Sequence, residues 1–73
     1  MNKTFGQKMV GISFNPANDD NVTKCKQKMA DVIDLLIEST PPDTDIKNAL
    51  FQMALQNILN AQMMAVKLLT FKD

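Results

Sequence analysis

Residues 44–70 of the chain, TDIKNALFQMALQNILNAQMMAVKLLT, decide the fold. This stretch contains neither glycine nor proline, and Asp43 or Thr44 can cap a helix that begins there. The helix predicted over 44–70 is about 39 Å long at 1.5 Å per residue. It follows Pro41-Pro42, which ends any earlier helix because proline lacks a backbone N–H and restricts the residue before it.

Apolar side chains cover more than half of the circumference of this predicted helix when residues are placed at about 100° intervals. They are Ile46, Leu50, Phe51, Met53, Ala54, Leu55, Ile58, Leu59, Ala61, Met64, Ala65, Val66, Leu68 and Leu69. The remaining polar strip is narrow and consists of Gln52, Gln56, Asn60 and Lys67. A helix that is apolar nearly all round must be buried on most sides. Leaving about six to eight such side chains in water forgoes about 1.5–3 kcal/mol each, so we expect self-association into a closed, symmetric oligomer.

A second helix is predicted upstream over 18–39, with Asn18 as its cap. Its apolar face would hold Val22, Cys25, Met29, Ala30, Val32, Ile33, Leu36 and Ile37. Its opposite face would hold Thr23, Lys24, Gln27, Lys28, Asp31, Asp34 and Glu38. Two helices joined by a short turn form an antiparallel hairpin, and this amphipathic helix can cover only one side of its neighbour.

The first 17 residues contain Gly6, Gly11 and Pro16 and offer one short strand-like run, Met9 to Phe14. We therefore expect residues 1–17 to form an extended lead segment and loop. The predicted fold is a single all-α domain over 1–73: an antiparallel two-helix hairpin with an N-terminal extended segment, assembled into a helical homo-oligomer.

Composition excludes several classes of function. The chain has 73 residues and eight Lys against eight Asp plus Glu, so it lacks the excess of positive charge that duplex nucleic acid requires. It has one cysteine and no histidine, which excludes an intrachain disulfide and a zinc site. The commonest general base is also missing, so we expect a non-enzymatic protein without cofactor or metal.

The N-terminal segment also bears on location. The longest apolar run between Met1 and Phe14 is Met9-Val10, far short of a signal-peptide core or a membrane span. We therefore expect no membrane association and a reducing, cytoplasmic setting.

Lys26 is the one polar residue on the apolar face of the first predicted helix. Its ammonium either reaches water along its aliphatic stem or binds an anion such as a phosphate. Phe14, held by the Asn15-Pro16 turn, either plugs the open end of the hairpin or stacks on a nucleobase. For Asp31, Asp34 and Glu38, a solvated helix face is favoured over an acid/base site.

Three segments together resemble a known family. They are Thr4 to Pro16 (TFGQKMVGISFNP), Lys26, and Ala54 to Ala65 (ALQNILNAQMMA). They resemble the short hairpin domain shared by two kinds of phage anti-defence sponge, the anti-CBASS protein of type two and the Thoeris anti-defence protein of type one. The family pattern has an aromatic residue, a His or Asn and a proline, then a basic residue early in the first helix, and a run like Ala-Leu-Thr-x-Leu-x-x-Ala-x-Met-Trp-Ala in the second.

The resemblance implies a protein that binds cyclic oligonucleotide or cyclic ADP-ribose signals without cleaving them, so that bacterial immune effectors stay silent. It implies small helical homo-oligomers, often hexamers, with ligand pockets between protomers, in the host cytoplasm if the protein is phage-encoded. Carried over to this chain, Phe14 would stack on a base and Lys26 would neutralise a phosphate, with Asn15 and Pro16 completing the motif.

This chain departs from the family pattern at three positions. Phe14 replaces the commoner tyrosine, Gln56 replaces the threonine, and Met64 replaces the tryptophan. Gln52 and Gln56 are the polar candidates for a further pocket on the second helix. Because the threonine of the family pattern is replaced in that pocket, the expected ligand is a cyclic dinucleotide rather than a cyclic trinucleotide. The alternative function is a small helical adaptor that binds a larger protein through the apolar second helix.

Overall fold

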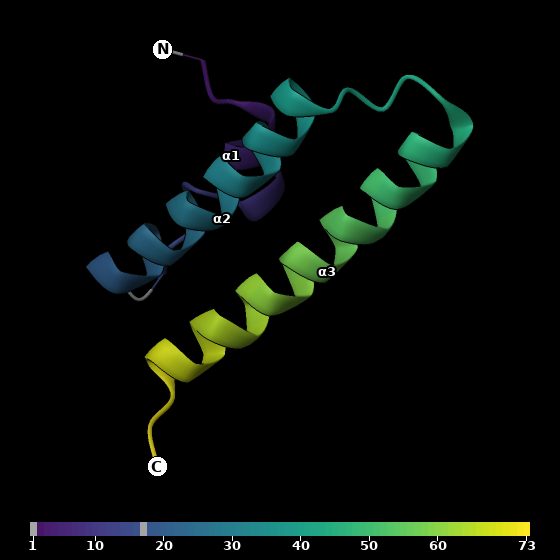
Figure 1. Ribbon diagram of the computed structural model, residues 1–73. Coiled ribbons are helices and arrows are strands. Elements are labelled where there is room, and N and C mark those ends of the chain that lie inside the picture. The colour runs from purple at the N-terminus through teal and green to yellow at the C-terminus, as the bar shows by residue number, and fades with distance from the viewer. Residues whose placement is uncertain (1, 17) are drawn as a thin grey trace.

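The computed structural model describes residues 2–16 and 18–73. Within them the chain forms three α-helices, α1 (Phe5–Val10), α2 (Asp20–Ser39) and α3 (Asp45–Thr70) (Figure 1). The all-α prediction is confirmed, and the two long helices begin one or two residues inside the expected ranges 18–39 and 44–70. Met1 and Ala17, which fall in the expected lead segment 1–17, lie outside the described residues.

The prediction of an extended lead segment is wrong at residues 5–10, which form helix α1. Thr4 and Gln7 make a capping box: the Gln7 N–H donates to Thr4 Oγ1 at 3.1 Å, and the Thr4 N–H donates to Gln7 Oε1 at 2.9 Å. These two bonds satisfy donors that a helix start otherwise leaves unpaired. Gly11 ends α1 in the left-handed conformation with φ 66°, which glycine adopts at no steric cost. The Thr-x-x-Gln spacing therefore outweighs the strand-like composition of the segment.

Helix α1 is attached to α2 by polar side chains that the sequence assigned to a solvated face. The Gly6 N–H donates to Asp34 Oδ1 at 2.8 Å, and Gln7 Nε2 donates to Gln27 Oε1 at 3.0 Å. A Cβ at position 6 would lie 2.3 Å from the Ala30 carbonyl oxygen. Only glycine allows α1 to approach α2 this closely.

The first turn of α2 corrects a second expectation. Its N-cap is Asp19, whose carboxylate accepts a hydrogen bond from the Asn21 N–H at 2.8 Å. Asn18, the expected cap, instead adopts a left-handed backbone with φ 51°, a conformation that asparagine tolerates better than most residues.

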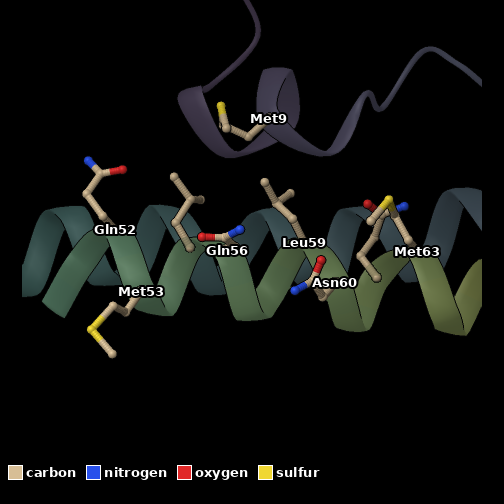
Figure 2. A pocket seen from close by; sticks show the side chains of 9 residues that line it. Met9, Gln52, Met53, Gln56, Leu59, Asn60 and Met63 are labelled. Carbon is tan, nitrogen blue, oxygen red and sulfur yellow. The ribbon is translucent and has the colours of Figure 1, made fainter. Parts of the chain in front are cut away.

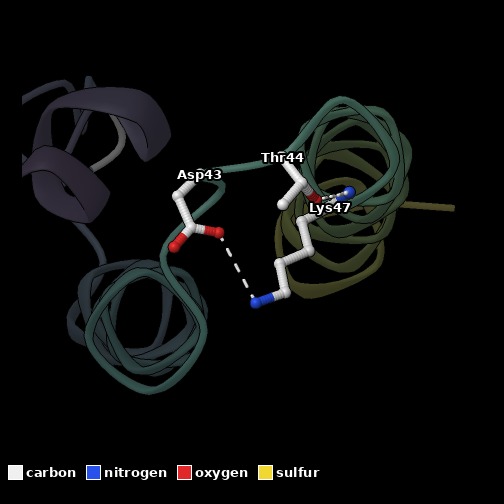
Figure 3. Close-up of polar contacts among 3 residues, drawn as sticks. All are labelled: Asp43, Thr44 and Lys47. Atoms are coloured by element: carbon white, nitrogen blue, oxygen red, sulfur yellow. Dashed lines mark hydrogen bonds and ion pairs between the residues drawn. The ribbon is translucent and has the colours of Figure 1, made fainter.

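At the other end of the molecule, Thr44 caps α3, as one of the two sequence alternatives predicted. Thr44 Oγ1 accepts a hydrogen bond from the Lys47 N–H at 3.1 Å, and the Lys47 ammonium lies 3.5 Å from Asp43 Oδ1 (Figure 3). The Thr40 N–H still donates to the Leu36 carbonyl, after which Pro41 and Pro42 end the helical path. The chain then reverses, so that α3 runs beside α2 in the opposite direction (Figure 1).

The core is small and lies where the three helices meet. It consists of Val10 from α1, Ala30 and Ile33 from α2, and Leu55 from α3. Partly buried apolar residues surround it: Ile12, Met29, Ile37, Phe51, Ile58 and Leu59. Val32, which was placed on the apolar face of α2, is exposed instead.

The chain is flat and exposes more surface than a compact protein of its size. Its extents are 45 × 31 × 14 Å, and the shortest of these is close to the thickness of a single helix layer. The accessible surface is 5535 Å², whereas a compact monomer of this mass exposes about 4,500 Å². In the part of the chain that the structure describes, no helix combines the length and apolar character needed to cross a membrane.

Candidate functional site

Lys26 is buried in the interior, with 5% of its surface exposed. Its ammonium donates hydrogen bonds to the carbonyl oxygens of Gly11, at 3.1 Å, and Phe14. The interpretation in which the Lys26 ammonium reaches water along its aliphatic stem is therefore wrong. The lysine instead holds the loop that follows α1, and the carbonyl oxygens offset the desolvation of its charge.

The same ammonium lies 5.4 Å from the centre of the Phe14 ring, within the range of a cation–π contact. Phe14 is 71% exposed as a residue, so it does not plug the core. The Phe14 N–H donates to the Gly11 carbonyl at 2.9 Å, which fixes the backbone that carries the ring. The exposed Phe14 on the constrained loop thus lies beside a positive charge that α2 provides.

Asn15 connects this loop to the start of α2. Its Nδ2 donates to the Asp19 carbonyl at 2.8 Å and to Thr23 Oγ1 at 2.9 Å, and its Oδ1 accepts from the Asp19 N–H at 3.3 Å. Its side chain is therefore engaged inside the protein on both its donor and acceptor sides. Asn15 therefore orients the loop through these internal hydrogen bonds.

These residues share one hollow with the C-terminal end of α3. The hollow has a volume of about 190 Å³ and is lined by Phe14, Asn15, Pro16, Val22, Lys26, Val66 and Thr70. Four of the predicted site residues are thus brought together. Sites for drug-sized ligands measure about 300–1,000 Å³, so this hollow is smaller than a site for a whole nucleotide-sized ligand.

Gln52 and Gln56, the other two predicted site residues, lie elsewhere. They line an open hollow of about 530 Å³ with Met9, Met53, Leu55, Leu59, Asn60, Gln62 and Met63. Figure 2 shows Met9 of α1 above this part of α3. The two sets of lining residues have no member in common. The second hollow also has no charged side chain in its wall, so it offers a phosphate no counter-charge.

Ten lining residues were not predicted as site residues from the sequence. Three lie beside Phe14: Val22, Val66 and Thr70. Seven lie in the larger hollow: Met9, Met53, Leu55, Leu59, Asn60, Gln62 and Met63. Gln62 could have been found, because it lies seven residues after the buried Leu55 and hence on the same stripe of the helix. Met9 could not, because its place depends on α1 packing beside α3.

A third hollow, of about 210 Å³, lies where α2 ends and α3 begins. Asp31 and Asp34, which were predicted to lie on a solvated face of α2, each accept a hydrogen bond within the chain. Asp34 accepts the Gly6 N–H, and Asp31 accepts a hydrogen bond from Gln27 Nε2 at 2.8 Å.

Comparisons with protein-family models, with curated proteins and with solved structures gave no match to this chain.

Proposed function

We propose that this chain is a non-catalytic binding protein that sequesters cyclic oligonucleotide signals, cyclic dinucleotides above all, and so blocks host anti-phage signalling. The observation that carries the proposal is the exposed Phe14 ring 5.4 Å from the buried Lys26 ammonium in one hollow. A cyclic dinucleotide carries flat bases and negative phosphates, and these two groups match an aromatic face and a fixed cation.

The ligand site is completed by another copy of the chain. One copy contributes the wall around Phe14, Pro16 and Lys26, whose volume of about 190 Å³ is too small for the whole ligand. The surplus of exposed apolar surface supports self-association. A homo-oligomer, a hexamer according to the family resemblance, would place the ligand between neighbouring copies.

Titration calorimetry with cyclic dinucleotides tests this function. The Phe14→Ala variant should bind about 5- to 150-fold more weakly than the unmodified protein, because stacking on one aromatic ring contributes about 1–3 kcal/mol. Phe71→Ala is the matched control, since Phe71 is comparably exposed, at 62%, and lies outside the hollow. Absence of binding by the unmodified protein, or equal binding by the protein and Phe14→Ala, would contradict the proposal.

The charge is tested separately, since Lys26 also holds the loop. Lys26→Met keeps much of the side-chain volume and removes the ammonium, whereas Lys24→Met removes an exposed charge two residues away. We expect binding to weaken only in the first variant, with helix content measured by circular dichroism in both. Chromatography of the ligand after incubation should recover it intact, and a cleaved product would reject the non-catalytic assignment.

A further inference from the structure

The middle of α3 has no formal charge, although much of it faces solvent. Residues 48–66 contain no Lys, Arg, Asp or Glu. Met53 is 63% exposed and Met63 is 59% exposed. Depletion of charge together with exposed methionine is typical of the centre of a protein–protein interface. This part of α3 therefore has the composition of a surface that is buried against another protein chain.

The polar groups on the same surface are carboxamides whose side chains make no hydrogen bond with another residue that the structure describes. Gln52, Gln56 and Asn60 lie four residues apart along α3 and line the 530 Å³ hollow. Gln62 lines it too and is only 7% exposed, yet its side chain makes no hydrogen bond with any described residue. No buried side-chain nitrogen or oxygen among the described residues lacks a hydrogen-bond partner, so the Gln62 amide reaches solvent. The carboxamides that line this hollow can both donate hydrogen bonds to an occupant and accept them from it.

We propose that the occupant is α3 of a second copy, packed antiparallel about a two-fold axis that crosses α3 at the level of Ile58, on the side of the helix opposite to the Ile58 side chain. Such an axis places residues that are equidistant from Ile58 opposite each other. Met53 then faces Met63 of the second copy, and Gln56 faces Asn60 of the second copy. The two methionine thioethers then pack against each other. The two carboxamides can form hydrogen bonds with each other, because each has both donors and an acceptor.

The helix geometry supports this register. At 100° per residue, Met53, Gln56, Asn60 and Met63 fall within an arc of about 80°, narrow enough to face one neighbouring helix. Asp45 and Lys67 lie on the same arc at the two ends of the uncharged stretch. The antiparallel arrangement brings the negative end of one copy toward the positive end of the other.

The available area is sufficient for such a pair. The chain exposes on the order of 1,000 Å² more than a compact monomer of its mass, given its accessible surface of 5535 Å². A standard interface buries about 800 Å² from each partner. The proposed pairing deepens the homo-oligomer of the proposed function by naming one of its contacts, and it assigns Gln52 and Gln56 to assembly.

Disulfide cross-linking tests the register. Two proteins, Gln56→Cys and Asn60→Cys, are prepared in a Cys25→Ser background, which removes the native thiol. When they are mixed and oxidised, the covalent dimer should form much faster than in either protein alone, because only the mixed pair places a cysteine opposite a cysteine. A mixture of Lys24→Cys and Lys28→Cys, on the outer face of α2, is the control. Equal cross-linking in all four preparations would overturn the register.

Sedimentation of Met53→Glu tests the surface itself. An unpaired carboxylate in this contact should raise the dissociation constant of the assembly by about 100-fold or more. Val32→Glu is the matched control, since it places the same charge at an exposed apolar position of α2. An unmodified protein that is monomeric at micromolar concentration, and associates only with a different protein, would replace the second copy with the adaptor alternative.

The two proposals fail in different experiments. Register-specific cross-linking without any binding of cyclic dinucleotides would retain the α3 pairing and reject the ligand. Binding of a cyclic dinucleotide by an oligomer that does not cross-link through residues 56 and 60 would retain the ligand and reject the pairing.

Discussion

Helices α2 and α3 use their apolar side chains in opposite ways. Helix α2 buries Val22, Lys26, Ala30 and Ile33, a continuous stripe at helical spacing. Helix α3 is longer and more apolar, yet only Leu55 and Gln62 are buried along it. The difference arises because α1 and α3 both pack against α2, whereas α3 lies at the edge of a flat molecule (Figure 1). Stability within one chain is thus concentrated on α2, and the apolar surface of α3 remains for other contacts.

The largest effect is expected at the centre of α2. Ile33→Ala should lower the free energy of unfolding by about 2–5 kcal/mol, because Ile33 is completely buried where the three helices meet. Leu35→Ala, on the same helix at a position 58% exposed, should change it by about 0.5 kcal/mol or less. Urea denaturation at one fixed protein concentration measures both. Equal losses would show that the core does not lie on this face of α2.

An intermediate effect is expected where α1 joins α2. Gly6→Ala should destabilise the protein by about 1–3 kcal/mol, because its Cβ would lie 2.3 Å from the Ala30 carbonyl oxygen and force the helices apart. Lys8→Ala, at an exposed position of α1, is the control. Denaturation curves give the stability, and hydrogen exchange at the Gly6 amide reports whether its bond to Asp34 is lost. If Gly6→Ala left the free energy of unfolding unchanged, α1 would not dock on α2 in this way.

The smallest effect is expected at the start of α3, which depends on its own cap. Thr44→Ala should cost about 1 kcal/mol through loss of the hydrogen bond to the Lys47 N–H. Asp43→Ala should cost less, about 0–1 kcal/mol, since its ion pair with Lys47 is exposed (Figure 3). Thermal denaturation of the two variants ranks them. A reversed order would make the ion pair the more important contact at this end of α3.

Particular residues show which features of this fold could be predicted from the sequence and which could not. Proline at positions 41 and 42, the cap at Thr44 and the 3.6-residue periodicity were enough to place α2 and α3 within two residues. The capping box of Thr4 and Gln7 was also present in the sequence, but the prediction did not use it and rested on two glycines, a proline and a short β-like run. The helical periodicity identified Lys26 as an unusual polar residue on an apolar face, but it did not predict which groups its ammonium contacts.

Local signals along the chain were enough to place the ends of the long helices, because caps, prolines and helical periodicity act between residues that are neighbours in sequence. Three features depend on how the helices pack: Lys26 binds the Gly11 and Phe14 carbonyls, Asp34 holds α1, and the six predicted site residues divide between two hollows. The hydrogen bonds among these contacts join residues that are 12 to 28 positions apart in the sequence. Their partners come together only after the helices have packed.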